Sequence, residues 1–174
     1  MKLKLAGLLF SLLASATAHA GLIGDSIHGE HRFPSLGSLY TNLGTRTIDA
    51  DGEAFLPMSS SYQLFVNDST ITADFLRSAT WTSTTFNGFV LTDLSETLFP
   101  SVTLNASSNL AGFDASDFWI SGNSLFVNLQ GLSFNSNSQL VFSVTAPASV
   151  PEPLTLGLLG IGLLGMAATR KRKA

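Results

Sequence analysis

Three carboxylates stand at alternate positions, at Asp49, Asp51 and Glu53, around a glycine that favours a turn. Calcium takes hard oxygen ligands from flexible loops, so these three acids form a candidate calcium site, and no other cofactor is indicated. The segment differs from an EF-hand loop, because one early acid and the later glutamate are missing. The alternative is a solvated turn between strands, and Asp114 with Asp117 forms a second acidic turn.

Two histidines, His28 and His31, stand close together with a glutamate between them. Imidazole nitrogens are zinc ligands, but a zinc site needs three or four protein ligands, and no third one lies nearby in the sequence. The order also differs from the H-E-x-x-H pattern of zinc proteases. A pair of solvated loop residues is the alternative interpretation.

The sequence contains few of the features that nucleophilic catalysis requires. Such catalysis needs a serine or cysteine with a base and an orienting group, and the chain has no cysteine and no G-x-S-x-G turn. Paired carboxylates could serve a glycosidase, but any acidic surface supplies such pairs. The sequence therefore predicts no catalytic residue, and an extracellular hydrolase is the third hypothesis for function.

Four aromatic residues could offer faces on which a sugar ring stacks, namely Tyr40, Tyr62, Trp81 and Trp119. In a β domain such rings belong more often to the core, where they bury a large apolar area. A carbohydrate- or calcium-binding β module is therefore the second hypothesis for function.

The region 21–150 is acidic and lacks lysine. Three arginines stand against eleven acidic residues, a net charge of −8, whereas the whole chain carries −3. Such a surface disfavours binding to nucleic acid or anionic lipid. Because there is no cysteine, the fold has to be stabilised by its core or by bound metal. Abundant serine, threonine, asparagine and glycine favour a β-rich extracellular module.

Short runs in which apolar and polar residues alternate predict strands with one buried face. The expected inward sets are Tyr62, Leu64 and Val66, then Ile71, Ala73 and Phe75, and finally Leu140, Phe142 and Val144. Asn87-Gly88 predicts a hairpin over 81–92, and Ser121-Gly122-Asn123 predicts another over 118–130. Strands recurring at intervals of about 8–12 residues predict an all-β fold, an antiparallel sandwich or barrel.

The first 20 residues have the features of a secretory signal peptide. Two lysines precede an apolar core over 5–13, and Ala18 and Ala20 occupy the small-residue positions that signal peptidase reads. Cleavage after Ala20 leaves Gly21 as the first residue of the mature protein. The sequence thus predicts export through the Sec machinery and processing by signal peptidase.

The last part of the chain combines a proline-rich triplet, an apolar run and a basic end. The triplet consists of Pro151, Glu152 and Pro153. The basic stop consists of Arg170, Lys171, Arg172 and Lys173. The apolar run between them is near the lower length limit of about 17 residues for a membrane helix. Because basic clusters stay in the cytoplasm, the preceding domain is expected outside it.

This order of Pro-Glu-Pro, short apolar span and basic end resembles the PEP-CTERM sorting signal of Gram-negative bacteria. The resemblance implies an exosortase-type enzyme that cuts near the triplet. It converts an inner-membrane precursor into a protein of the cell surface or extracellular matrix, where this family is associated with exopolysaccharide and biofilm. Residues 24–40, 86–94, 102–118 and 124–134 are also similar to a recurrent domain of PEP-CTERM proteins that has no assigned activity.

These features together predict five parts of the chain. They are a signal peptide (1–20), a β-sandwich ectodomain (21–146), a linker with the Pro-Glu-Pro motif (147–153), a transmembrane helix (154–169) and a basic cytoplasmic tail (170–174). The first hypothesis for function is a non-enzymatic structural or interaction role in the matrix, with exopolysaccharide as a partner.

Overall fold

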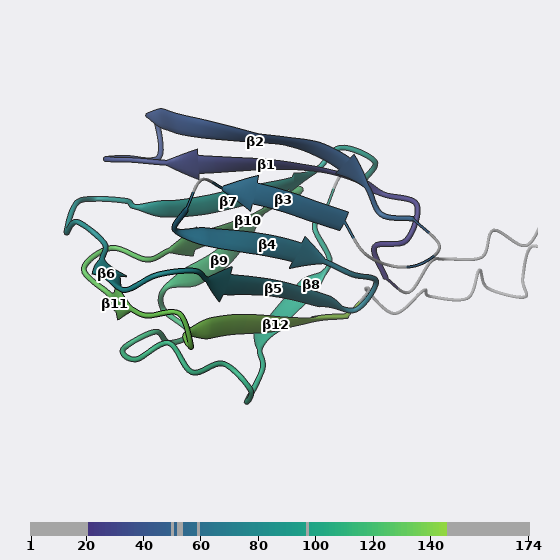
Figure 1. The fold of residues 1–174 in the computed structure, drawn as a ribbon. Helices are drawn as coiled ribbons and strands as arrows, with labels where there is room; N and C mark the ends of the chain where they lie inside the picture. The colour runs from purple at the N-terminus through teal and green to yellow at the C-terminus, as the bar shows by residue number, and fades with distance from the viewer. Residues whose placement is uncertain (1–20, 50, 52–53, 59, 97, 146–174) are drawn as a thin grey trace, which may run out of the picture.

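The computed structural model describes residues 21–49, 51, 54–58, 60–96 and 98–145, in which two five-stranded antiparallel sheets pack face to face (Figure 1). The first sheet contains, in order, β2 (Leu39–Thr47), β1 (Ser26–Arg32), β7 (Gly88–Asp93), β10 (Ser124–Asn128) and β9 (Phe118–Ser121). The second contains β3 (Ala54–Met58), β4 (Tyr62–Val66), β5 (Thr70–Phe75), β12 (Gln139–Thr145) and β8 (Ser101–Leu104). A small third sheet pairs β6 (Ala79–Thr80) with β11 (Ser133–Phe134). The predicted all-β antiparallel class is confirmed.

The core lies between the two large sheets and follows from strand alternation. Side chains two positions apart point to the same face of a strand, so Tyr62, Leu64 and Val66 on β4 are all fully buried. The sets predicted on β5 and β12 are buried too, namely Ile71, Ala73, Phe75, Leu140, Phe142 and Val144. From the opposite sheet, Leu91 and Leu125 enter the same cluster. One continuous core therefore holds the sandwich together.

The hairpin predicted around Ser121-Gly122-Asn123 is confirmed. β9 and β10 pair with Ser121 opposite Ser124, and Gly122 has a φ of 60° in the loop between them. Glycine adopts a positive φ without the steric cost that a side chain would bring, which suits it to this two-residue loop.

The hairpin predicted over 81–92 is wrong. The segment before β7 forms no strand, and β7 begins at Gly88 and pairs with β1 and β10. Asn87 is buried, with 3% of its surface exposed. At Gly88 the neighbouring strand comes so close that an added Cβ would lie 1.9 Å from the carbonyl oxygen of Val127. The Asn-Gly pair therefore marks a tight packing position rather than a turn.

Gly88→Ala is expected to lower the free energy of unfolding by about 1–3 kcal/mol, because the methyl group overlaps a backbone oxygen that is fixed by strand pairing. Denaturant unfolding of the exported protein measures the effect. The matched control is Gly37→Ala, where the nearest atom to a new Cβ is the Ser35 Oγ at 3.9 Å. An unchanged midpoint for Gly88→Ala would contradict the close approach of β7 and β10.

Both ends of the described domain meet the turn between β4 and β5. The Leu22 N–H donates to the backbone oxygen of Asp68 at 3.0 Å, and the Val144 N–H donates to that of Ser69 at 2.8 Å. The chain segment that follows Thr145 therefore starts from this end of the sandwich.

The predicted signal peptide, linker, membrane helix and basic tail lie outside the described residues, so their bounds remain predictions. Within the residues that are described, no helix has the length and apolar character needed to cross a membrane.

Candidate functional site

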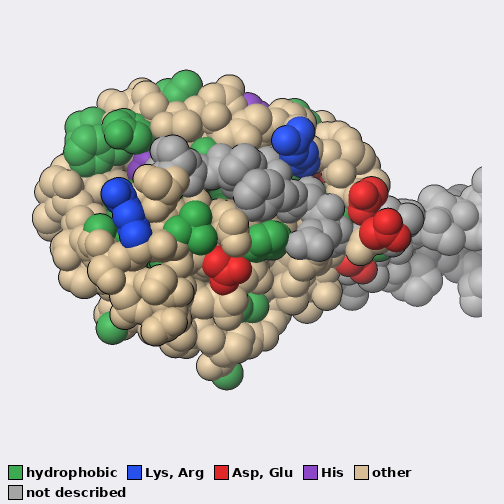
Figure 2. All heavy atoms as spheres, viewed as in Figure 1, with side chains coloured by type: hydrophobic (Ala, Val, Ile, Leu, Met, Phe, Trp, Pro, Cys, Tyr) green, Lys and Arg blue, Asp and Glu red, His purple; other side chains and the backbone are tan. Residues whose placement is uncertain are grey.

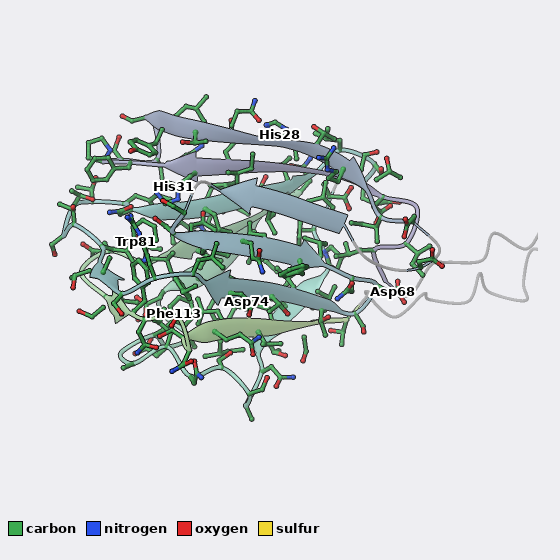
Figure 3. The ribbon with its side chains drawn as sticks, in the orientation of Figure 1. His28, His31, Asp68, Asp74, Trp81 and Phe113 are labelled. Carbon is green, nitrogen blue, oxygen red and sulfur yellow. The ribbon has the colours of Figure 1, made fainter. Side chains whose placement is uncertain are left out.

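A pocket of about 340 Å³ opens at the end of the sandwich opposite the β4–β5 turn. We call it the Arg77 pocket. It is formed mainly by His31, Tyr40, Ser61, Arg77, Trp81 and Asn87. Figure 2 shows a basic side chain near a histidine and a group of apolar side chains toward this end, with acidic side chains gathered at the other end. In Figure 3, His31 and Trp81 lie toward the pocket end and Asp68 lies at the far end.

Strand alternation places His31 in this pocket and keeps His28 out of it. On β1 the inward positions are Ile27, Gly29 and His31, so His28 lies on the outer face with Glu30. Because residues an odd number of positions apart point to opposite faces, the two histidines cannot bind one zinc ion. Across the described parts of the chain, no group of three or more potential metal ligands is present. The zinc interpretation of the histidine pair is therefore wrong.

His31 lies in a chain of hydrogen bonds. Its Nδ1 is 3.0 Å from the Tyr62 hydroxyl, and its Nε2 is 3.1 Å from the Asn87 Oδ1. The Asn87 amide nitrogen donates to the backbone oxygen of Thr82 at 3.1 Å, which fixes the amide oxygen toward the imidazole. His31 therefore donates a hydrogen bond from Nε2 to Asn87 and accepts one at Nδ1 from the Tyr62 hydroxyl. Both ring nitrogens thus have partners, from two other segments of the chain.

Burial keeps this imidazole neutral. Only 1% of the His31 surface is exposed, and desolvation lowers its pKa from 6.5 to about 4, against a smaller raising effect of the hydrogen bond to Asn87. Burial also raises the pKa of Tyr62 well above its usual value. The network thus carries no charge near neutral pH, and the charge of the pocket comes from another residue.

Three of the four predicted sugar-stacking aromatics meet around His31. Trp81 stacks on its ring with centroids 5.2 Å apart, Tyr62 approaches at 5.9 Å, and Tyr40 meets its edge at 5.8 Å. Tyr62 is fully buried, so it belongs to the core, whereas Tyr40 is 63% exposed. Trp119 lies elsewhere, stacked on Phe126 of β10. Tyr40 is therefore the aromatic ring of this group most open to a ligand.

Arg77 brings a positive charge to the pocket. Its Nη2 donates to the Ser61 Oγ at 2.9 Å, and the Ser61 carbonyl accepts the Leu76 N–H at 2.9 Å. No aspartate or glutamate is found among the described residues that line the pocket. Arg32, by contrast, forms an ion pair with Glu30 at 2.6 Å on the outer face of β1. The Arg77 guanidinium has no acidic partner within the described structure.

Trp81 lines the pocket and has a buried polar atom. Its indole Nε1 is buried and has no hydrogen-bond partner among the residues that the structure describes. A buried donor without an acceptor costs about 1–3 kcal/mol. Because this atom is buried, the open pocket does not present it to a ligand.

The chain was compared with protein families, with curated proteins and with solved structures. The family model of the PEP-CTERM protein-sorting motif matches residues 149–173. This chain carries a PEP-CTERM sorting motif. The match contains the predicted Pro151, Glu152 and Pro153, and it extends through the apolar run to Lys173. No curated protein and no solved structure matches the chain.

The PEP-CTERM motif implies an exported precursor that is anchored in a membrane and processed by an exosortase-type enzyme for the cell surface. The motif follows the described domain, whose last strand ends at Thr145 beside the β4–β5 turn. The Arg77 pocket lies at the opposite end. In the described domain the pocket is therefore at the end opposite Val144, after which the chain continues toward the motif.

Asp49 and Asp51 of the predicted calcium triplet do not line the pocket. Asp49 and Asp51 are exposed, just after Ile48, which exchanges backbone hydrogen bonds with Gly24 and Asp25 near the start of the domain. Glu53 lies outside the described residues, so the triplet remains a prediction. The other acidic turn is held by its own bonds: the Asp114 N–H donates to the Asp117 Oδ2 at 2.9 Å. The hydrogen bonds from Ser116 lower the pKa of Asp114.

Sequence reasoning did not identify Arg77, Ser61 or Asn87 as pocket residues. A signal for Arg77 was present, because it is the single basic residue between Arg46 and Arg170. A lone cation in a long acidic stretch supplies the positive charge that a site for an anionic ligand needs. Ser61 and Asn87 gave no comparable signal, since serine and asparagine are common throughout the domain.

Proposed function

We propose that this PEP-CTERM protein is exported, is released from its membrane anchor by an exosortase-type enzyme, and has a non-enzymatic structural or interaction role in an exopolysaccharide matrix. The match of the sorting motif to residues 149–173 carries the proposal, because that motif directs a protein to exosortase processing. The signal peptide predicted before Gly21 supplies the matching export step through the Sec machinery. Positive charge at both ends of the precursor supports an ectodomain outside the cytoplasm.

A non-enzymatic role is supported by the state of the residues in the Arg77 pocket. A general base needs a pKa near the working pH and access to the proton it removes. His31 has neither property, because its pKa is about 4 and both nitrogens already have partners. The described pocket wall holds no carboxylate that could replace it.

A carbohydrate-binding module is the second candidate function, and the pocket itself favours it. An exposed aromatic ring, Tyr40, and a guanidinium, Arg77, line one concave site of a size suited to a small ligand. The calcium-binding alternative depends on Asp49, Asp51 and Glu53, and it is tested by the same experiment with and without the ion.

The test is isothermal titration of the exported protein with the polysaccharide of the source organism, with and without calcium, followed by sizing of the polysaccharide. We expect binding that leaves the polymer length unchanged. Shortened polymer would contradict the non-enzymatic role and favour the hydrolase. Binding that needs calcium and is lost in Asp51→Ala would place the polysaccharide-binding site at the acidic triplet and not at the pocket.

A further inference from the structure

We infer that the Arg77 pocket binds a carboxylate-bearing sugar, a uronate unit of an acidic polysaccharide, with Arg77 on the carboxylate and Tyr40 against the sugar ring. This inference rests on the proposed matrix role and adds the chemical class of the partner. It is carried by two independent observations on the pocket: its charge and its exposed ring.

The first observation is the charge. The region 21–150 has a net charge of −8, yet the described wall of this pocket holds an arginine and no acid. A guanidinium binds a carboxylate through two parallel hydrogen bonds, which are stronger than bonds between neutral groups. One guanidinium nitrogen of Arg77 donates a hydrogen bond to Ser61, which leaves other N–H donors for a ligand. An anionic ligand fits this site better than a neutral or cationic one.

The second observation is the exposed ring of Tyr40. Its edge contacts are with His31 at 5.8 Å and Phe33 at 5.9 Å, both T-shaped, and 63% of the residue remains exposed. These neighbours fix the orientation of the ring while leaving much of its surface to solvent. The C–H face of a pyranose ring would bury apolar area on it. A simple inorganic anion would gain nothing from this ring. Arg77 and Tyr40 together therefore favour an acidic sugar.

Two threonines of the wall also suit a sugar. Thr80 and Thr82 line the pocket beside Arg77. A threonine hydroxyl can donate a hydrogen bond to a sugar hydroxyl or accept one from it.

Two acidic residues on the strands that lead toward the pocket point to the outer faces of their sheets. Glu30 lies on the outer face of β1 in an ion pair with Arg32, and Asp74 lies on the outer face of β5, where it accepts a hydrogen bond from Gln139 at 2.6 Å. The acids around the β4–β5 turn lie beyond the length of β4, roughly 16 Å for its five residues. That distance exceeds the Debye length of about 8 Å at physiological salt.

The position of the pocket agrees with a polymeric ligand. The tail starts from the end of the sandwich where Leu22 and Val144 bind the β4–β5 turn. A pocket at the opposite end is therefore open to matrix both before and after release from the membrane. A uronate unit within a chain and a free uronate monosaccharide have the same chemistry, and the test separates them.

The test is titration of the exported protein with short galacturonic acid oligomers. The comparison ligands are the methyl-esterified oligomers, the free monosaccharide and a sulfated oligosaccharide. We expect binding of the acidic oligomer, weaker binding of the monosaccharide, and loss of binding on esterification or at high salt. Arg77→Gln should weaken binding about 10- to 100-fold, the value expected for charge-assisted hydrogen bonds. Tyr40→Ala should weaken it, and Tyr40→Phe should restore it.

Arg46→Gln is the matched control, because it removes the same charge from β2 at a position opposite Ile27, away from the pocket. It should bind like the wild type. Equal binding of acidic and esterified oligomers, preference for the sulfated sugar, or equal loss in Arg46→Gln would overturn the inference. Circular dichroism of each variant separates lost binding from lost folding.

Retention in the matrix separates the inference from the proposed function. If Arg77→Gln is processed normally and stays in the matrix like the wild type, the pocket inference fails and the matrix role stands. If the processed wild type is absent from the matrix, the proposed function itself fails.

Discussion

Replacing Pro151, Glu152 and Pro153 together with alanine is expected to trap the full-length precursor in the inner membrane. Proline fixes φ and disfavours helix at the residue before it, so we expect the helix of the predicted span not to continue back toward the domain. An extended peptide next to the bilayer is accessible to a processing enzyme. Alanine removes both restrictions and the carboxylate, while the apolar run and basic stop that direct insertion are unchanged.

Membrane fractionation with detection of the ectodomain measures this effect. The wild type should appear in the released fraction and the triple variant in the inner membrane. Pro147→Ala is the control, because it changes a proline of the same linker outside the triplet. Release of the triple variant at the wild-type rate would show that the triplet is not the processing handle.

Acidification is expected to destabilise the fold through His31. Its pKa is about 4 in the folded protein and 6.5 in the unfolded chain. Between these two pKa values the unfolded state binds more protons at His31 than the folded state does. The stability that depends on neutral His31 is therefore fully present above pH 6.5 and is lost as the pH decreases toward 4. Between about pH 7.5 and about pH 4.5 the loss from this group alone is about 2.5 kcal/mol.

Denaturant unfolding of the wild type and of His31→Gln at these two pH values isolates this contribution. Carboxylates titrate in both proteins, so the difference between the two pH dependences belongs to His31. The wild type should lose about 2.5 kcal/mol more than the variant on acidification. His28→Gln, the same change on the outer face of β1, should behave like the wild type. Equal losses in the wild type and His31→Gln would contradict the buried neutral imidazole.

The sequence predicted the strands whose one face is apolar, because alternation records burial directly. Tyr62, Leu64 and Val66 on β4 are the clearest case, and the hairpin at Gly122 followed from its turn residues. The hairpin at Asn87-Gly88 was predicted wrongly, because the same dipeptide also suits a close approach between strands. Local sequence does not distinguish these two uses, since the deciding neighbour, Val127, is distant along the chain.

The pocket was only partly predictable for the same reason. Tyr40 and Trp81 were identified as possible sugar-stacking residues, but their meeting with Arg77 depends on strands that pair across the sandwich. The spacing of His31 to His28 suggested a metal-ligand pair. The inward orientation of His31 depends instead on the register of β1, which that spacing does not reveal. The tail needed no tertiary information, since its triplet, apolar run and basic end are consecutive.

The two described ends of the domain lie together, because Leu22 and Val144 both donate to the β4–β5 turn. The Arg77 pocket lies at the opposite end of the described sandwich. The sorting motif follows the described domain in the sequence.

Intact mass spectrometry of the wild-type protein, isolated from hosts with and without an exosortase, shows whether this chain is exported and then freed from its predicted C-terminal anchor. We predict a released species in the exosortase-positive host that begins at Gly21 and lacks residues 154–174, and no such species in the negative host. A protein that keeps residues 154–174 in the exosortase-positive host would contradict this proposal and leave the tail as a permanent anchor.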